Sequence, residues 1–124
     1  MDDTLTADNK ALALALGALI RDHKGIDVVV MDLRPLNIWT DFFIIATVSS
    51  HTHLQGLRRA VKEFAGLRGI DIPGRSRRLS SGDEWNLIDI GTIVVHLMTA
   101  KTRGFYELER LWGAAEILSL SEAR

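Results

Sequence analysis

Two apolar runs constrain the fold of this chain more than any other feature of its sequence. The first, IDVVVMDL, begins at Ile26 and is rich in β-branched residues, and the second, DFFIIATV, occupies residues 41–48. Runs of this kind are typical of strands that are buried on both faces of a sheet. Pro35 lies between them and ends the first strand, and the short connection favours an antiparallel pair.

Helical patterns flank these two runs. Thr6 or Asp8 can cap a first helix, which residues 24–25 (Lys-Gly) end. Its apolar positions repeat with helical period at Ala11, Leu12, Ala15, Leu16, Leu19 and Ile20. The serines at 49–50 offer caps for a second helix, which ends near Gly66.

The remaining chain predicts a loop, a hairpin and a last helix. Residues 67–84 are rich in Gly, Ser and Arg and indicate an exposed loop. WNLIDI and TIVVHLM surround Gly91 and predict a β-hairpin, and a helix follows from about Thr102 into the tail. The order α, β, β, α, β, β, α predicts an α/β fold with a mixed sheet and a right-handed helical crossover between its second and third strands. We expect one domain over residues 1–124, with its core at about 6–118.

Charge and composition exclude several classes of protein. Fifteen Lys and Arg oppose sixteen Asp and Glu, so the net charge is −1 and any contact with nucleic acid would have to be local. The chain has no cysteine, which excludes disulfides and thiolate nucleophiles. Its start lacks the pattern of a signal peptide, and its apolar runs are far shorter than the roughly 20 residues that span a bilayer. These features predict a soluble, cytoplasmic protein.

Three aspartates at or near predicted strand ends are the candidates for catalysis. Asp32, Asp41 and Asp89 could hold Mg²⁺ in a nucleotidyl-transfer site, which needs two or three converging carboxylates. Such a site commonly has a DxD spacing, whereas Asp41 is followed by two phenylalanines, and the chain contains no glycine-rich phosphate-binding motif. The sequence therefore predicts no site of this type.

The histidines favour structural roles over chemistry. His51 and His53 point in different directions on a predicted helix start, which favours capping or surface roles over a metal site. His96 lies inside VVHLM, and no triad or metal-binding motif surrounds it. We interpret it as a buried histidine that donates to a backbone carbonyl, with a general base or a metal ligand as the alternative.

The stretch RGFYELERLW, at residues 103–112, leaves two interpretations open. On one continuous helix, a stripe of apolar residues would face the core. That stripe consists of Phe105, Leu108, Leu111, Trp112, Ala115 and Leu118. Off the stripe, either Tyr106 covers the core edge while Arg103 pairs with Glu107, or Arg103, Tyr106 and Glu109 form a patch that faces a partner. Trp39 and Trp85, at strand edges, could likewise cover the sheet or contact a partner.

Several strings of the sequence resemble one known family. TDFFIIAT followed by SSHTH, then WNLIDIGTIVVHLM, then RGFYELERLW are similar in order and separation to the ribosomal silencing factor family, also called the Iojap family. The resemblance spans about residues 6–114, and the last string is the most specific. Val48, Ile90 and Thr92 depart from the family pattern, and the loop at 74–84 lacks its usual Glu-Gly pair.

The resemblance implies a fold and a function. Members of the family are similar to nucleotidyltransferases in fold but lack the catalytic acids, which implies no enzyme activity, no metal and no cofactor. It implies binding to the large ribosomal subunit through ribosomal protein fourteen of that subunit, which blocks subunit joining and represses translation, especially when nutrients are scarce. It also implies a homodimer when the protein is free.

The resemblance suggests which residues make the contact, and a rival hypothesis remains. We expect the partner-binding residues to be Asp41, Trp85, Asp89, Arg103, Tyr106 and Glu109. A minor contact with ribosomal RNA could come from a loop that concentrates arginines, namely Arg75, Arg77 and Arg78, although a solvated loop is the alternative. The rival function is a nucleotidyltransferase or nucleotide-binding enzyme that uses Asp32, Asp41 and Asp89.

Overall fold

The computed structural model describes residues 3–36, 38, 40–70, 77–78, 84–118 and 120. The predictions made for Trp39 and Arg75 lie outside the described residues, as does most of the loop predicted at 67–84. In chain order, the elements are α1 (Asp3–Asp22), β1 (Ile26–Asp32), the short 3₁₀ helix η1 (Arg34–Leu36), β2 (Phe42–Val48), α2 (His51–Leu67), β3 (Arg77–Arg78), β4 (Trp85–Asp89), β5 (Ile93–Thr99), α3 (Ala100–Tyr106), α4 (Leu108–Leu111) and β6 (Glu116–Leu118).

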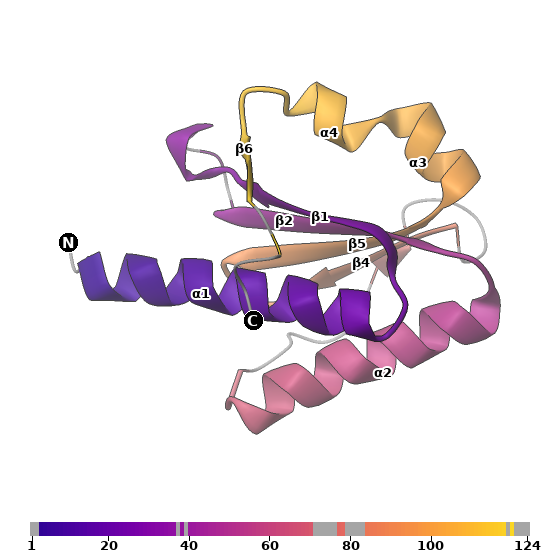
Figure 1. The fold of residues 1–124 in the computed structure, drawn as a ribbon, viewed down its shortest axis with the longest axis horizontal. Helices are drawn as coiled ribbons and strands as arrows, with labels where there is room; N and C mark the ends of the chain where they lie inside the picture. The colour runs from indigo at the N-terminus through magenta and orange to yellow at the C-terminus, as the bar shows by residue number, and fades with distance from the viewer. Residues whose placement is uncertain are drawn as a thin grey trace.

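The elements form three layers around one mixed sheet. The strand order is β3-β4-β5-β2-β1-β6, with α1 and α2 on one face of the sheet and α3 and α4 on the other (Figure 1). The predicted α/β fold with a mixed sheet is therefore confirmed. Among the described residues, no helix combines the length and the apolar character that a membrane-spanning segment needs.

The pairing of the four long strands agrees with the sequence. β1 and β2 are antiparallel, as their short connection indicated, and β4 and β5 form the hairpin around Gly91, whose φ is +90°. The helical connection through α2 leads from β2 to β4, which lies one strand beyond the parallel neighbour of β2. That neighbour is β5, in register from Phe42 opposite Ile93 to Val48 opposite Thr99.

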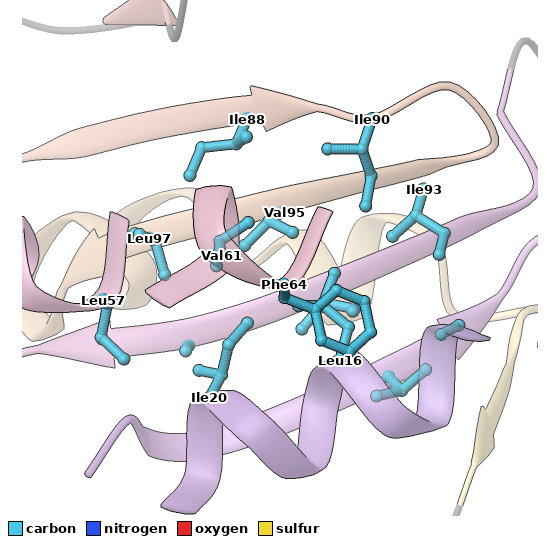
Figure 2. Close-up of a cluster of buried hydrophobic side chains, with 14 of the residues drawn as sticks. Leu16, Ile20, Leu57, Val61, Phe64, Ile88, Ile90, Ile93, Val95 and Leu97 are labelled. Atoms are coloured by element: carbon cyan, nitrogen blue, oxygen red, sulfur yellow. The ribbon is translucent and has the colours of Figure 1, made fainter. Parts of the chain in front are cut away.

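Side chains alternate between the two faces of the sheet and build two separate clusters. On the α1–α2 face, Leu16 and Ile20 of α1 and Val61 of α2 pack against residues such as Val95 of β5 (Figure 2). Full burial of a side chain of this size contributes about 1.5–3 kcal/mol, so this cluster is the main source of stability. On the other face, a smaller cluster holds Met31, Leu33, Phe43, Ile45, Trp85, Val94, Met98 and Leu108.

The predicted limits of the first two helices are partly right. α1 begins at Asp3, before both predicted caps, Thr6 and Asp8, so that prediction is wrong. α2 begins as expected, because the Ser50 side chain accepts a hydrogen bond of 3.0 Å from the His53 backbone N–H. This bond satisfies one of the four backbone donors that a helix start leaves unpaired.

The prediction of a single long C-terminal helix is wrong. α3 ends at Tyr106, because Glu107 adopts a left-handed conformation (φ 48°) and its N–H bonds back to the Arg103 carbonyl oxygen at 2.9 Å. After the short α4, the chain becomes extended and β6 pairs antiparallel with β1. β1 thereby forms backbone hydrogen bonds with β6 along an edge that would otherwise be unpaired.

Candidate functional site

The site is built around Trp85, which begins β4 on the face that α3 and α4 cover. Its indole N–H donates to Nδ1 of His96 on the neighbouring strand at 3.1 Å, and only 9 % of its surface is exposed. Phe43 packs edge-on against the His96 ring, with 4.5 Å between ring centroids. Trp85 is therefore held in place from beneath by a hydrogen bond and by aromatic packing.

His96 is buried as predicted, but its hydrogen bond differs from the prediction. It accepts from Trp85 through Nδ1 instead of donating to a backbone carbonyl. Its proton therefore lies on Nε2, for which no described residue supplies an acceptor. Burial lowers the pKa of His96 from 6.5 to about 4, so the ring is neutral at physiological pH and can serve as the acceptor that Trp85 needs.

Tyr106 covers the outer side of Trp85. The two ring centroids lie 4.7 Å apart, and Tyr106 remains 45 % exposed at the end of α3. Phe105 packs edge-on against Tyr106 at 4.9 Å and is 78 % exposed. The sequence left Tyr106 undecided between covering the core and facing a partner, and the structure shows that it does the first while it stays partly exposed.

Four large apolar residues project into solvent on this side of the sheet, and we call them the apolar patch: Phe105, Tyr106, Leu111 and Ile117. Leu111 in α4 is 68 % exposed and Ile117 in β6 is 54 % exposed. Ile117 lies on this face because it pairs with Met31, and directly paired residues of adjacent strands point to the same side. Phe105 and Tyr106 contact each other, whereas Ile117 lies on β6, four strands away from β4, so the four side chains are spread over this face. An exposed apolar surface of this kind is a candidate surface for a partner.

The patch corrects the predicted core stripe. Phe105 and Leu111 were expected in the core, but the break at Glu107 rotates the two helical segments and leaves both residues in solvent. Only Leu108 is buried as predicted within the cluster of this face, with Trp112 and Ala115 partly buried against it. Leu118 is buried too, but it reaches the α1–α2 cluster from β6.

Arg103 and Glu109 pair with one another beside the patch. The Nη2 atom of Arg103 lies 2.8 Å from a Glu109 carboxylate oxygen, and Nη1 donates to the Thr47 hydroxyl at 3.0 Å and to the Ile26 carbonyl oxygen at 3.4 Å. The alternative in which Arg103 pairs with Glu107 is therefore wrong, and Glu107 instead lies 3.8 Å from Arg110. With only 11 % of its side chain exposed, Arg103 ties α3 and α4 to the sheet.

Asp41 and Asp89 lie at the other end of the sheet from Trp85 and Arg103. Asp41 precedes the first residue of β2, whereas Arg103 bonds to Thr47 near its last residue, roughly 20 Å along an extended strand. Asp89 ends β4, and its carboxylate accepts from the Gly91 N–H at 2.9 Å, which shapes the hairpin turn. The six predicted site residues thus form two groups, and only Trp85, Arg103, Tyr106 and Glu109 lie near the patch.

The three candidate catalytic aspartates do not converge. Asp32 lies on the α1–α2 face, since it pairs with Phe42, whereas Asp89 pairs with Val94 on the opposite face. Arg34 binds Asp32 through two hydrogen bonds of 2.9 and 2.7 Å. Burial raises the pKa of Asp32, but the hydrogen bonds and charge of Arg34 outweigh this and bring the pKa below its ordinary value. Asp32 is therefore engaged in a local ion pair.

The histidines at the start of α2 have local partners as well. Nδ1 of His53 accepts from the Ser49 backbone N–H at 3.0 Å, and Nε2 of His51 lies 3.4 Å from the Gln55 amide. Within the described parts of the chain, no three histidine or acidic side chains come close enough to hold a metal ion together.

Fold and patch together define a class of protein: a three-layer α/β domain with one closed face and one face that presents apolar side chains. The family model described as "Ribosomal silencing factor during starvation" matches residues 6–124, so the chain belongs to this family.

Individual relatives agree with this assignment. A protein named ribosomal silencing factor from Treponema pallidum is 38 % identical over 100 residues, which cover 81 % of this chain and 88 % of that protein. The mouse protein named "Mitochondrial assembly of ribosomal large subunit protein 1" is 34 % identical over 98 residues, 78 % of this chain and 43 % of its own length. A crystal structure of a Chromobacterium violaceum protein superimposes with a TM-score of 0.72 at 34 % identity, covering 85 % of each chain.

Sequence reasoning missed Phe105, Leu111 and Ile117 as surface residues. A signal was present for Ile117, because this segment follows Gly113, which is a poor helix former and weakens the case for one continuous helix. For Phe105 and Leu111 the helical spacing was misleading, since nothing in YELER marks Glu107 as the point where the helix breaks.

Proposed function

We propose that this protein binds the large ribosomal subunit through ribosomal protein fourteen of that subunit, prevents the small subunit from joining, and represses translation, especially when nutrients are limiting. The observation that carries the proposal is the exposed apolar patch on the α3–α4 face of a chain that belongs to the ribosomal silencing factor family. The name of the mouse relative, which refers to the large ribosomal subunit, also supports it.

The contact centres on Tyr106, with Phe105 and Leu111 beside it. Tyr106 rests on Trp85, which His96 holds from beneath, so its ring is already in place before a partner arrives. Binding then loses little side-chain entropy, which is why rigid aromatic residues are frequent anchors of interfaces. Trp85 acts as the support of the anchor. Arg103 and Glu109 form a polar border, and Asp41 and Asp89 provide polar contacts at the far rim.

Steric exclusion is sufficient for the mechanism, and no chemical step is required. A standard interface covers roughly 800 Å² of each partner, an area that a domain of 124 residues can supply from one face. A bound protein of this size then occupies a surface that a second ribosomal subunit would need. We therefore propose a non-enzymatic role in the cytoplasm, and the rival reading of a nucleotidyltransferase finds no support in aspartates that point to opposite faces.

We also propose that the free protein is a homodimer. Exposed apolar side chains on one face are unfavourable in water, and a two-fold interface would cover the same patch on both copies. Sedimentation velocity over a range of concentrations tests this, and Leu111→Ala should shift the equilibrium towards monomer. A wild-type protein that stays monomeric at all concentrations would disprove the dimer without affecting the ribosomal proposal.

The deciding experiment is co-sedimentation with purified large subunits. Wild-type protein should sediment with the large subunits. When small subunits are added, it should also lower the light scattering that subunit joining produces. Tyr106→Ala should lose at least tenfold in affinity, as expected for an interface anchor. Tyr106→Phe keeps the ring on Trp85 and should bind nearly as wild type. Leu67→Ala is a matched control, because Leu67 is 78 % exposed, like Phe105, but belongs to α2 on the other face.

The result can contradict the proposal at two levels. If wild-type protein stays in the supernatant, the ribosomal proposal fails for this chain. If it sediments and a folded Tyr106→Ala variant sediments equally well, the protein binds through another surface and Tyr106 only covers Trp85.

The minor contact with ribosomal RNA through Arg75, Arg77 and Arg78 remains part of the proposal. Arg77 and Arg78 form β3, the edge strand that pairs with β4, so they lie at a margin of the sheet. Neutralising this pair should weaken large-subunit binding only slightly and more at low salt than at high salt.

A further inference from the structure

One flank of α2 gathers side chains that donate hydrogen bonds or carry positive charge. Gln55, Arg58, Arg59 and Lys62 line a shallow surface hollow of about 220 Å³. Arg58 and Arg59 lie three and four positions after Gln55 and four and three positions before Lys62, so each arginine has its Cβ atom about 5–6 Å from those of Gln55 and Lys62. We call these four residues the basic flank, and none of the described residues that line its hollow is a carboxylate.

The acid of α2, Glu63, lies four positions after Arg59, at the border between the basic flank and the side of the helix that faces α1. Glu63 lines a separate groove between α1 and α2, together with Ala60, Phe64 and Leu67. Because the whole chain has a net charge of −1, the concentration of three cations in one hollow is a local feature and does not follow from the average composition. Local charge of this kind attracts a polyanion even when the whole protein does not.

The basic flank is separated from the apolar patch by the sheet. α2 lies on one face of the sheet, and α3 and α4 lie on the other (Figure 1). Leu57 and Val61 of α2 pack towards the sheet, where Ile88 and Leu97 lie (Figure 2). A different side of α2 faces α1. A partner on the patch therefore leaves the basic flank accessible, and both surfaces can be occupied at once.

We propose that the basic flank binds the phosphate backbone of structured RNA without reading its sequence. Arginine forks match phosphate oxygens, and the lysine adds a point charge. The residues that the structure describes around the hollow include no aromatic side chain, so they offer no stacking for unpaired bases. The described lining also has no large apolar side chain, which distinguishes it from a surface that inserts into a membrane and from a groove that takes an apolar peptide. We propose RNA and not DNA because the inference rests on the proposed function, in which the partner is a ribosomal subunit.

The test measures binding of the purified protein to an RNA duplex of about 20 base pairs by fluorescence anisotropy, over a range of salt concentrations at fixed Mg²⁺. Wild type should bind at low salt, with an affinity that falls steeply as salt rises. The double variant Arg59→Gln/Lys62→Gln should bind about tenfold more weakly, and its salt slope should be smaller by about 1–2, because each lost phosphate contact removes about 0.9 from the slope. Glutamine keeps the helix propensity of these exposed positions.

A matched control removes the same charge elsewhere. Lys10→Gln/Lys24→Gln also changes the net charge from −1 to −3 but leaves the hollow intact, and it should bind RNA nearly as wild type. The proposal is overturned if wild type does not bind the duplex at low salt, or if both double variants weaken binding equally. Equal or tighter binding to polyglutamate or to vesicles of anionic phospholipid would also overturn it, because the flank would then be selective for charge alone or for a membrane.

The same reagents separate this inference from the proposed function. Tyr106→Ala should bind the RNA duplex as wild type does, since Tyr106 belongs to α3, which lies on the other face of the sheet. If wild-type protein binds the duplex through the basic flank but does not sediment with large subunits, the proposed function fails and the assignment of the flank stands.

Discussion

The two faces of the sheet differ in how completely their helices cover them. α1 and α2 have 20 and 17 residues and bury a continuous apolar cluster, whereas α3 and α4 have 7 and 4 and leave the apolar patch in solvent. Short helices cannot cover the area that long ones cover, and β6 adds an exposed isoleucine at the sheet edge. The sheet thus separates a face that stabilises the fold from a face that is free to bind.

The largest effect on stability should come from the closed face. Leu16 is fully buried between α1 and the sheet, so Leu16→Ala removes its packing and leaves a cavity. We expect the free energy of unfolding to fall by about 3 kcal/mol, measured by urea denaturation. The affinity of the remaining folded protein for large subunits should stay unchanged. If a folded Leu16→Ala protein lost that affinity, the two faces would not be independent.

Protonation of His96 should lower the free energy of unfolding at acidic pH, because His96 supports Trp85 on the face that α3 and α4 cover. The unfolded chain takes up this proton near pH 6.5, but the folded chain resists until about pH 4. Stability from neutral His96 is therefore fully present above pH 6.5 and is lost as the pH falls towards 4, by about 3 kcal/mol in total. A proton on Nδ1 would also face the Trp85 N–H and break their hydrogen bond.

The control for this pH dependence is His96→Asn, which keeps an acceptor for Trp85 but does not titrate. The variant should be less stable at neutral pH, and its stability should change less than that of wild type between pH 6.5 and 4. Asp32 has a pKa below 3.8, so its contribution is lost as the pH falls below this window. Urea denaturation at several pH values measures this difference. If the free energy of unfolding changed equally with pH in wild type and variant, the burial of neutral His96 would be contradicted.

Arg103→Ala should have an intermediate effect. The substitution removes the ion pair with Glu109 and the hydrogen bond to Thr47, and it leaves the Glu109 carboxylate, which is mostly shielded from solvent, without this cation. We expect a loss of about 2 kcal/mol, because hydrogen bonds to charged groups contribute about 1.5–3 kcal/mol. Thermal unfolding checks the value, and Arg110→Ala, at a position with 83 % of the side chain exposed, is the control. A change below 0.5 kcal/mol would mean that Arg103 does not fasten α3 and α4.

Phe105→Ala and Leu111→Ala should have the smallest effect on stability. Both side chains are mostly in solvent, and exposed positions usually change stability by less than about 0.5 kcal/mol. Each should nevertheless weaken binding to large subunits severalfold, measured by co-sedimentation at matched concentrations of folded protein. A loss of stability above about 2 kcal/mol would place these residues in the core, as the sequence pattern suggested.

Local signals in the sequence were sufficient for most of the fold. The β-branched run at 26–33 and the run at 41–48 became the antiparallel strands β1 and β2, and Gly91 marked the hairpin of β4 and β5. These signals succeed because burial on both faces of a central sheet leaves a continuous apolar run, which neighbouring residues alone reveal.

The candidate site depended on information that is not local. The sequence singled out Trp85 and Tyr106 but could not show that one stacks on the other, since 21 residues and a turn of the chain separate them. It predicted Phe105 and Leu111 to be buried, because helical spacing assumes a helix that continues. It grouped Asp41 and Asp89 with Arg103, although they lie at opposite ends of the sheet.

By itself, the sequence determined the central strands, the closed face under α1 and α2, and the resemblance to the ribosomal silencing factor family, because each follows from the type and spacing of neighbouring residues. Only the tertiary structure decided the course of the C-terminal segment. The unpaired edge of β1 could gain hydrogen bonds from residues 116–118, and the helix had to break at Glu107 for the chain to reach that edge. The same break turned Phe105 and Leu111 outward, so long-range strand pairing produced the apolar patch.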